Sequence, residues 1–353
     1  MSRIALVLAC NTHWAPYMHR YIRELDNANK EYVLIYWNRE NITENLPCET
    51  KVFNAIDEIG RHGWKKPFYF LEFAQFVKKE LAKEQYEKVV FLGTYACVPA
   101  IISGFLKRKY KGKYWIDIRD LTYEENGLFN RLQAKAIINS YKTVVSSKGF
   151  ESYLPVYNYG HIHNIDTNIE IMARKLHKID DDKIRISYIG NVGFYEECQK
   201  FIDYFANDNR FVLGFYGAGS EVLETYCKEK MITNIKFAGR FERERTVDFY
   251  NITDIIYNNY GNQGINLRTA LSNKLYYAMR FDYPILVSEN TYMEEISKEQ
   301  GLGFTVKYTK DLPDRLYKWY MSRNDNSSKQ KFKWSDIVKE DCNAISDFIS
   351  FIK

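Results

Sequence analysis

The sequence predicts an α/β protein with two doubly wound domains that face each other across a cleft and are closed by a C-terminal helix. Short apolar strands alternate with helical patterns through the first half of the chain. The alternation stops in a polar, charged stretch at 166–183 and begins again at 184. Strands and helices that alternate in this way form parallel sheets covered on both faces.

The first domain is expected over residues 1–165 and opens with an apolar strand at 4–9. Further strands are expected at 32–37, 88–93, 113–118 and 143–146, with helices ending at 25 and spanning 68–83, 99–109 and 128–139. Residues 166–183 are expected to form a linker with some helix, because they have little strand character.

The second domain is expected over residues 184–333. Its strands are expected at 184–189, 211–216, 235–238, 254–258 and 284–288, and its helices at 198–205, 222–229, 244–251 and 270–279. Both domains follow the Rossmann-like pattern, in which ligands bind outside the carboxyl ends of the strands. The amphipathic residues 334–353 are predicted to form the closing helix.

The composition is that of an ordinary globular protein, with 46% hydrophobic and 27% charged residues among 353. No segment has the pattern of a signal peptide or a membrane span. The six cysteines show no C-x-x-C spacing, which predicts reduced thiols without a zinc site or a disulfide framework. We therefore expect a cytoplasmic protein.

The positive charge is concentrated in the first domain. Residues 1–165 hold 23 basic and 17 acidic side chains, and the rest of the chain holds 27 and 28. Cations interleave with aromatic residues at 105–115 and again at 64–70. These stretches suit peripheral attachment to an anionic inner membrane surface, and a solvated helix end followed by a strand is the alternative for 105–115. Nucleic-acid binding is not expected, because the acidic second half would oppose a phosphate track.

Three strand ends of the second domain carry glycine, and they predict a site for a nucleotide diphosphate. The first turn holds Gly190, Asn191 and Gly193, the second holds Gly217 and Gly219, and the third is Gly239 followed by Arg240. Glycine lets backbone N–H groups approach a phosphate closely, and the N-terminus of the following helix favours negative charge.

A helix, turn and strand at 271–288 is the segment most indicative of a site. Asn273 and Lys274 fall in the first turn of this helix, from which a lysine can reach a pyrophosphate. A solvent-facing lysine on an amphipathic helix is the alternative. Arg240 and Arg268 are further candidates to neutralise the diphosphate, since a guanidinium contacts two phosphate oxygens at once.

These segments are similar to those of the GT-B-fold glycosyltransferases, in particular the family 4-like enzymes of bacterial capsule and other surface polysaccharides. The turns at 190 and 217–219, the strand end 237–240 and the segment 273–284 follow that family's order and spacing. The acidic pair at 294–295 and the run 161–164 are further points of resemblance, and the similarity is diffuse outside 184–300.

Two positions depart from the family pattern. Tyr277 and Thr269 stand where the resemblance implies a pair of glutamates, one of which holds the ribose hydroxyls. The turn at 191–197 also lacks the Arg and Lys that commonly clamp the diphosphate. The ribose end of the site, including Tyr277, is therefore expected to differ.

The resemblance implies a hexosyltransferase-type enzyme that moves a sugar from a nucleotide-diphosphate sugar to a glycan or lipid-linked acceptor in surface polysaccharide synthesis. It implies retention of configuration and no catalytic metal or other cofactor. A sugar-nucleotide 2-epimerase of the same fold and a non-catalytic nucleotide-sugar-binding protein are the alternatives.

Acceptor-side residues are expected on the first domain. The loop after its first strand carries Asn11, His13 and Trp14, and His13 is a candidate proton acceptor or else an ordinary exposed histidine. Asp117, Arg119 and Asp120 follow the strand at 113–118. We expect Asp120 to be catalytic and Arg119 to face the acceptor, with a structural ion pair as the alternative.

Overall fold

The computed structural model describes residues 3–56, 66–93, 97–165, 183–323 and 334–353. The chain contains two compact units, Met1–His163 with Ile337–Lys353, and Asn164–Asp336. We call them unit 1 and unit 2. Most of the predicted linker, residues 166–182, lies outside the described residues.

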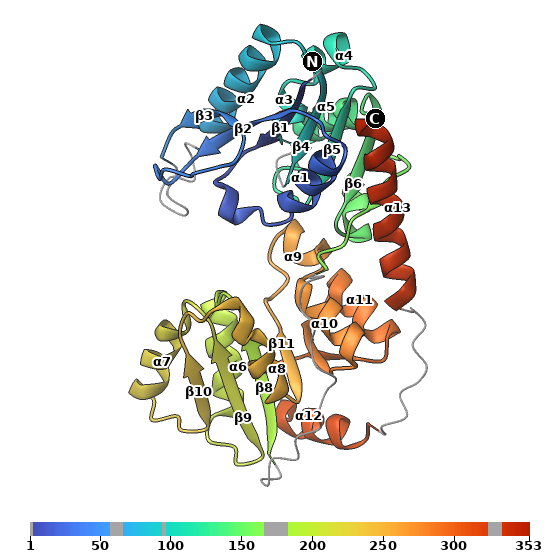
Figure 1. Ribbon diagram of the computed structural model, residues 1–353. Coiled ribbons are helices and arrows are strands. Elements are labelled where there is room, and N and C mark those ends of the chain that lie inside the picture. The colour runs from blue at the N-terminus through green and yellow to red at the C-terminus, as the bar shows by residue number, and fades with distance from the viewer. Residues whose placement is uncertain (1–2, 57–65, 94–96, 166–182, 324–333) are drawn as a thin grey trace. The chain divides into compact units, whose positions relative to one another are not determined.

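Unit 1 is built on a seven-stranded parallel sheet in the order β3-β2-β1-β4-β5-β6-β7. Its strands are β1 (Arg3–Leu8), β2 (Tyr32–Asn38), β3 (Glu49–Asn54), β4 (Tyr86–Leu92), β5 (Tyr114–Ile118), β6 (Lys142–Val145) and β7 (Gly160–His161). Its helices are η1 (Thr12–Trp14), α1 (Met18–Asn27), α2 (Lys66–Lys83), α3 (Cys97–Ile101), α4 (Ser103–Lys109), α5 (Gly127–Ile138) and η2 (Lys148–Tyr153) (Figure 1).

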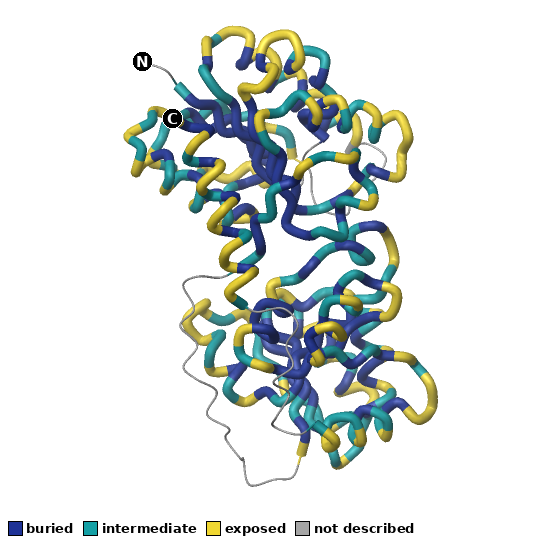
Figure 2. The backbone as a smooth tube through the Cα atoms, turned by 90° about the vertical axis from the view of Figure 1, so that its right-hand side faces the viewer, coloured by how far each residue is buried: buried dark blue, intermediate teal, exposed yellow. Residues whose placement is uncertain are grey.

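The central strands of unit 1 are buried (Figure 2), and their side chains are apolar on both faces, as is typical of parallel strands covered by helices on both sides. Side chains of a strand alternate between the two faces. Leu34 and Tyr36 of β2 belong to the core formed with α1, whereas Trp37 points to the opposite face and packs against Phe70 and Phe73 of α2.

The C-terminal helix α13 (Trp334–Ile352) completes the core of unit 1. Its buried Phe348 lies edge-on to Tyr21 of α1, with ring centroids 4.8 Å apart, and to Trp115 of β5 at 5.3 Å. Polar contacts support the same placement, since Arg20 binds the carboxylate of Asp341 and the backbone N–H of His163 donates to that carboxylate.

Unit 2 has a six-stranded parallel sheet in the order β10-β9-β8-β11-β12-β13. The strands are β8 (Ile184–Ile189), β9 (Phe211–Tyr216), β10 (Ile235–Ala238), β11 (Ile255–Asn258), β12 (Ile285–Ser288) and β13 (Gly303–Val306). The helices are α6 (Tyr195–Phe205), α7 (Ser220–Glu229), η3 (Arg243–Arg245), α8 (Thr246–Asn251), α9 (Ile265–Thr269), α10 (Asn273–Phe281), α11 (Tyr292–Glu299) and α12 (Leu312–Met321).

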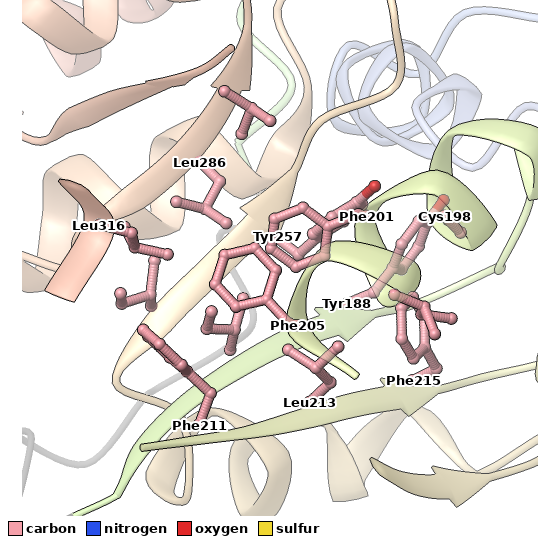
Figure 3. Packing of buried hydrophobic residues seen from close by; sticks show 14 of the residues in the cluster. Tyr188, Cys198, Phe201, Phe205, Phe211, Leu213, Phe215, Tyr257, Leu286 and Leu316 are labelled. Carbon is pink, nitrogen blue, oxygen red and sulfur yellow. The ribbon is translucent and has the colours of Figure 1, made fainter. Parts of the chain in front are cut away.

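A hydrophobic core of unit 2 lies between its sheet and helices α6, α7 and α12 (Figure 3). Aromatic rings fill much of it: Phe201 stacks on Phe205 with centroids 4.4 Å apart, and Tyr257 of β11 meets Phe201 edge-on at 5.0 Å. On the opposite face Tyr250 of α8 packs against Tyr277 of α10 at 4.8 Å. Much of the chain's tyrosine content therefore serves packing.

The predicted fold class is confirmed, because each unit is a parallel sheet with helices and the C-terminal helix is present. The sequence interpretation missed β3, whose residues are only partly buried and mostly polar, as is common for an edge strand. It also merged α3 and α4, which are separate helices on either side of Ile102. Within the described residues, no helix combines the length and apolar character that crossing a bilayer requires.

Candidate functional site

The strand order of unit 2 marks the position between β8 and β11 as the one where a ligand is expected to bind. The chain runs from β8 outward to β9 and β10, and then returns to β11 on the other side of β8. This reversal of direction is the topological switch point of a doubly wound sheet, where ligands bind beyond the carboxyl ends of the strands. The residues that follow β8 and β11 therefore define the candidate site.

Lys274 is a buried cation at this switch point. It is the second residue of α10 and only 7% of its surface is exposed. Among the described residues no carboxylate lies within ion-pair distance of its Nζ atom, although buried lysines in proteins are almost always paired.

Two aromatic rings and a glycine turn surround the ammonium group. Lys274 Nζ lies 4.8 Å from the ring centroid of Tyr188 at the end of β8 and 5.6 Å from that of Tyr260 after β11. A Cβ atom added to Gly190 would lie 3.7 Å from the same Nζ. The aromatic faces stabilise the cation without neutralising it.

Burial lowers the pKa of Lys274 to about 8. The lysine is therefore mostly charged at neutral pH, even though its surroundings disfavour the charge. Burial raises the pKa of the neighbouring Cys198 thiol and of the Tyr188 hydroxyl to about 12, so neither supplies a counter-charge. This arrangement is suited to an anion that arrives from outside.

The N-terminus of α10 adds a second attraction for negative charge. The N-cap residue Ser272 does not cap the helix with its side chain, because its hydroxyl donates to Oδ1 of Asn258 over 2.7 Å. The first backbone N–H groups of the helix thus keep their capacity to bind a ligand, and the helix dipole favours an anion there.

The turn after β8 also presents backbone donors. The N–H groups of Gly190 and Val192 donate to carbonyls at the end of β9 and in the turn after it. Those of Asn191 and Phe194 have no partner among the described residues. Gly190 has a φ of +117°, which an L side chain rarely adopts. Gly193 has open space on its Cβ side.

Gly217 and Gly219 are required by packing. A Cβ on Gly217 would lie 1.8 Å from the carbonyl oxygen of Gly190, and one on Gly219 would lie 2.4 Å from that of Val192. Their N–H groups donate to Ala238 and to the Glu221 carboxylate. These two glycines bring the turns after β8 and β9 together, and their predicted phosphate contacts remain a prediction.

The other predicted donor-side residues are more dispersed. Arg240 is exposed beyond the edge strand β10, two strands away from β8, and Asn273 is exposed at the start of α10. Arg268 is half-buried in α9. Tyr277 is buried on α10 against Tyr250. The structure thus groups Lys274 with the Gly190 turn and separates Arg240 from them.

Two acidic or hydroxyl positions near this region have structural partners. Glu294 is bound to the residues that start α11, because its carboxylate accepts from the N–H of Asn290 while its own N–H donates to the hydroxyl of the N-cap residue Thr291. The Thr269 hydroxyl donates to the carbonyl of Ile265 over 2.7 Å.

In unit 1 the loop after β1 forms a polar cluster with the loop after β2. His13 is half-exposed, with its Nε2 atom 3.3 Å from the Glu40 carboxylate, and the indole N–H of Trp14 donates to the same carboxylate over 2.6 Å. Trp14 is 52% exposed. His13 is therefore accessible and lies beside acidic groups that can orient it.

Asn11 is fully buried, and its side chain is hydrogen-bonded to other groups of the protein. Its side-chain amide donates to Asn38 and Glu44, and its oxygen accepts from the N–H of Arg39 over 2.9 Å. It joins the ends of β1 and β2, and no group of its side chain is left for an acceptor.

Asp117 and Arg119 form a buried ion pair at the end of β5. One carboxylate oxygen of Asp117 accepts from two nitrogens of Arg119 at 2.8 and 2.9 Å and from the hydroxyl of Tyr21 at 2.8 Å. Arg119 also donates to the carbonyl of Ile162 and is 6% exposed. The structural ion pair, the alternative for these residues, is what the geometry shows, while Asp120 is partly exposed beside it.

The basic stretch at 105–115 separates its charges from its aromatic rings. Tyr110, Tyr114 and Trp115 are buried in unit 1. Lys107, Arg108, Lys111 and Lys113 are exposed. These three rings therefore cannot enter a membrane surface, whereas Phe105 is partly exposed. In the other stretch Phe68 is 60% exposed, and residues 64–65 lie outside the described part.

Within the described residues no group of three or more His, Cys, Asp or Glu side chains could hold a metal ion. A run of three aspartates at 180–182 lies outside the described residues.

Sequence reasoning missed Tyr188, Phe194 and Tyr260 as parts of the site. Tyr188 lies within the apolar strand β8, where the pattern predicts a core residue. Nothing in that pattern indicates that a lysine lies close to this tyrosine. Tyr260 precedes a glycine-rich loop directly after β11. Its position after the end of a strand is the feature of the sequence that could have indicated a role in the site.

We compared the chain with known proteins. No protein-family model and no curated protein sequence matches it. Its structure is similar to that of sucrose-phosphate synthase from Thermosynechococcus elongatus, with a TM-score of 0.67 at 13% identity over 99% of this chain and 100% of the other. The chain has the GT-B fold.

Two further solved structures agree with this assignment of the fold. Anabaena HepE, solved in complex with UDP and glucose, matches with a TM-score of 0.60 at 12% identity over 98% of this chain and 99% of the other. A Listeria monocytogenes protein assigned as a UDP-N-acetylglucosamine 2-epimerase matches with a TM-score of 0.58 at 9% identity, over 99% and 97%. At these identities the comparisons show the fold alone.

Proposed function

We propose that this chain is a glycosyltransferase whose donor, a nucleotide-diphosphate sugar, binds at the switch point of unit 2. The observation that carries the proposal is Lys274, a buried cation without a carboxylate partner among the described residues, which faces the Gly190 turn at the N-terminus of a helix. The similarity to structures of sugar-transferring enzymes, one of them solved with UDP and glucose, supports the same proposal.

Glycosyl transfer requires positive groups that stabilise a leaving phosphate, and this site contains such groups. During transfer the bond between the anomeric carbon and a phosphate oxygen breaks, and the nucleotide diphosphate leaves with the electron pair. The acceptor hydroxyl oxygen bonds to the anomeric carbon, and its proton passes to a base. Lys274 and the N-terminus of α10 stabilise the charge that develops on the leaving phosphate, without a metal.

For the acceptor side we propose His13 as the proton-accepting base and Asp120 as a second catalytic group, with Trp14 as a surface against which a glycan ring stacks. His13 and Trp14 are accessible, and the carboxylate of Glu40 orients both side chains. Retention of configuration and a role in surface polysaccharide synthesis belong to the same proposal and rest on the sequence resemblance.

Titration calorimetry with a panel of nucleoside diphosphates and their sugars tests the donor site. We expect at least one to bind the wild-type chain, and Lys274→Met to weaken that binding tenfold or more through loss of a charge-assisted contact. Lys236→Met is the matched control, because Lys236 is an exposed lysine of the same unit on β10. Equal affinity in Lys274→Met and wild type would contradict the proposal.

A sugar-nucleotide 2-epimerase is the second candidate, and the similarity to the Listeria protein favours it. The two reactions differ in their products. A transferase releases free nucleoside diphosphate in proportion to the acceptor supplied. An epimerase converts one nucleotide sugar into another with no acceptor present, and that result would replace the transferase proposal.

A lipid-linked acceptor and peripheral attachment to an anionic membrane complete the proposal. Phe68 and Leu71 on one side of α2 are exposed at 60% and 44%, and Lys78 and Lys79 follow on the same helix. Co-sedimentation with vesicles should show a preference for anionic over neutral lipid that Phe68→Ser reduces. Equal sedimentation with both vesicle types would remove this part.

A further inference from the structure

Phe194 is an exposed aromatic residue in a backbone conformation that phenylalanine rarely adopts. It precedes α6 with φ 54° and ψ 46°, in the left-handed region, and 45% of its surface is exposed. For a bulky side chain this conformation is an outlier, and such outliers concentrate at functional sites. Phe194 lies outside the buried core of unit 2, so core packing does not explain this conformation.

The ring of Phe194 lies nearly parallel to that of Tyr260. Their centroids are 4.8 Å apart and their planes differ by 20°. Tyr260 belongs to the loop after β11, so the stack joins the two loops on either side of the switch point. Because one face of the Phe194 ring rests on Tyr260, the exposed area is its other face and its edge.

The stack of Phe194 on Tyr260 is adjacent to Lys274, the residue proposed to bind the phosphate. Tyr260 is also one of the two rings below the Lys274 ammonium group, 5.6 Å from its Nζ atom. The N–H of Phe194 has no partner among the described residues, and neither has that of Asn191. The charged side chain of Lys274 and the flat ring of Phe194 therefore both lie next to the same tyrosine.

We propose that Phe194, supported by Tyr260, is a stacking platform for a ring joined to the phosphate that Lys274 holds. This inference rests on the proposed function and deepens it, because it assigns a recognition residue for a ring of the donor. Both the base and the sugar of a nucleotide sugar are rings linked through phosphate, and either can lie flat on an aromatic face.

The test uses the full chain and three classes of ligand in titration calorimetry: inorganic pyrophosphate, nucleoside diphosphates, and the corresponding nucleotide sugars. Phe194→Leu keeps an apolar side chain and removes the flat ring. We expect it to bind pyrophosphate as tightly as the wild type and a ring-bearing ligand about tenfold more weakly. Phe194→Tyr should restore the affinity.

The ligand series identifies the ring. A loss already seen with nucleoside diphosphates places the base on Phe194, and a loss seen only with nucleotide sugars places the sugar there. An equal loss for pyrophosphate, or no loss for any ligand, overturns the inference while the donor site at Lys274 stands. If the wild type binds none of the three classes, both the inference and the proposed function fail.

A matched variant separates recognition by the ring from an effect of the backbone conformation. Met231 is matched to Phe194, because it is 80% exposed with a φ of 54° in the same unit. Glycine relieves this conformation at either position, and Phe194→Gly also removes the stack on Tyr260. Only Phe194→Gly should weaken binding of the ring-bearing ligand. Equal affinity of Phe194→Gly and Met231→Gly for that ligand would overturn the proposal.

Discussion

At the scale of single residues, the candidate site depends on the burial of one charged side chain, that of Lys274, which is unfavourable in free energy. Lys274 is charged in an environment that disfavours charge, and two tyrosine rings compensate for only part of the lost hydration. A residue kept for stability would not have these properties. Lys274 should therefore weaken the folded state while it strengthens ligand binding.

Replacement of Lys274 by methionine should stabilise the unliganded protein at pH 7. Its folded pKa of about 8 is below the usual lysine value of 10.5, so the cost of burying the charge is fully present below pH 8 and is lost as the pH rises from 8 through 10.5. The gain should be about 1–3 kcal/mol at pH 7 and should shrink to less than about 1 kcal/mol near pH 10. Urea unfolding at both pH values measures it, and a destabilised variant at pH 7 would mark Lys274 as a structural lysine.

Binding of a nucleoside diphosphate should weaken above pH 8. Only protonated Lys274 attracts the phosphate. The groups that face it do not gain charge in this range, since burial raises the pKa of Cys198 and Tyr188 to about 12 and holds that of Tyr260 well above its usual value. Affinity should fall up to about tenfold for each pH unit above 8. Calorimetry from pH 7 to 9.5 checks this, and in Lys274→Arg the slope should disappear because arginine stays protonated.

At the scale of elements, short segments are held in place by charged contacts from distant parts of the chain. Glu340 of α13 accepts from Nε2 of His163, just after β7, at 3.0 Å and forms an ion pair with Lys148 of η2 at 2.7 Å. β7 has only two residues, so its own hydrogen bonds hold it weakly. Glu340 links it to the helix that completes the core.

Replacement of Glu340 by glutamine should destabilise unit 1 in a pH-dependent way. The hydrogen bond from His163 lowers the pKa of Glu340 to about 2, and Lys148 adds to this. The stabilisation is present above the unfolded pKa of about 4.3 and is lost as the pH falls through about 2. We expect a loss of about 1–2 kcal/mol at pH 6 that shrinks toward pH 2.

Urea unfolding between pH 2 and 6 measures this difference. Glu295→Gln is the control, because Glu295 is an exposed glutamate of unit 2. A pH-independent difference for Glu340→Gln would show that the contacts of its carboxylate charge do not stabilise the unit.

At the scale of the whole molecule, each unit has its own sheet and core. The N-terminal strand and the C-terminal helix, far apart in sequence, belong to the same core of unit 1. A ligand bound by Lys274 should therefore stabilise unit 2 directly, and a defect in α13 should affect unit 1.

Phe348→Ala tests this division. The side chain is fully buried between Tyr21 and Trp115, so its removal should cost about 3–5 kcal/mol. Scanning calorimetry should show a lowered transition that the nucleotide does not shift, next to a transition that the nucleotide raises. A variant that lowers the nucleotide-sensitive transition instead would contradict the assignment of α13 to unit 1.

The fold was predictable because its signals are local. Alternation of apolar strands with helices, and its restart at 184, specify two parallel sheets whatever the chain does elsewhere. The edge strand β3 and the two-residue β7 were not predictable, because neither is apolar or long enough to carry a pattern. Their hydrogen bonds to β2 and β6 hold them as strands, although their own sequences have little strand character.

The site was predictable only in part. Lys274 and the Gly190 turn could be found from their positions in the chain. Asn11 and Arg119 have the same polar character, but their burial among Asn38 and Asp117 commits them to the protein itself.

Composition and periodicity are properties of neighbouring residues, and they were enough to specify two parallel sheets and a lysine at the start of a helix. Which polar groups meet a partner depends on residues that the chain brings together from far apart. Tyr260 lies 14 positions before Lys274, and Phe194 lies 66 before Tyr260. Folding places all three around one switch point. Whether a charge is satisfied is therefore decided by distances in space, which local patterns do not encode.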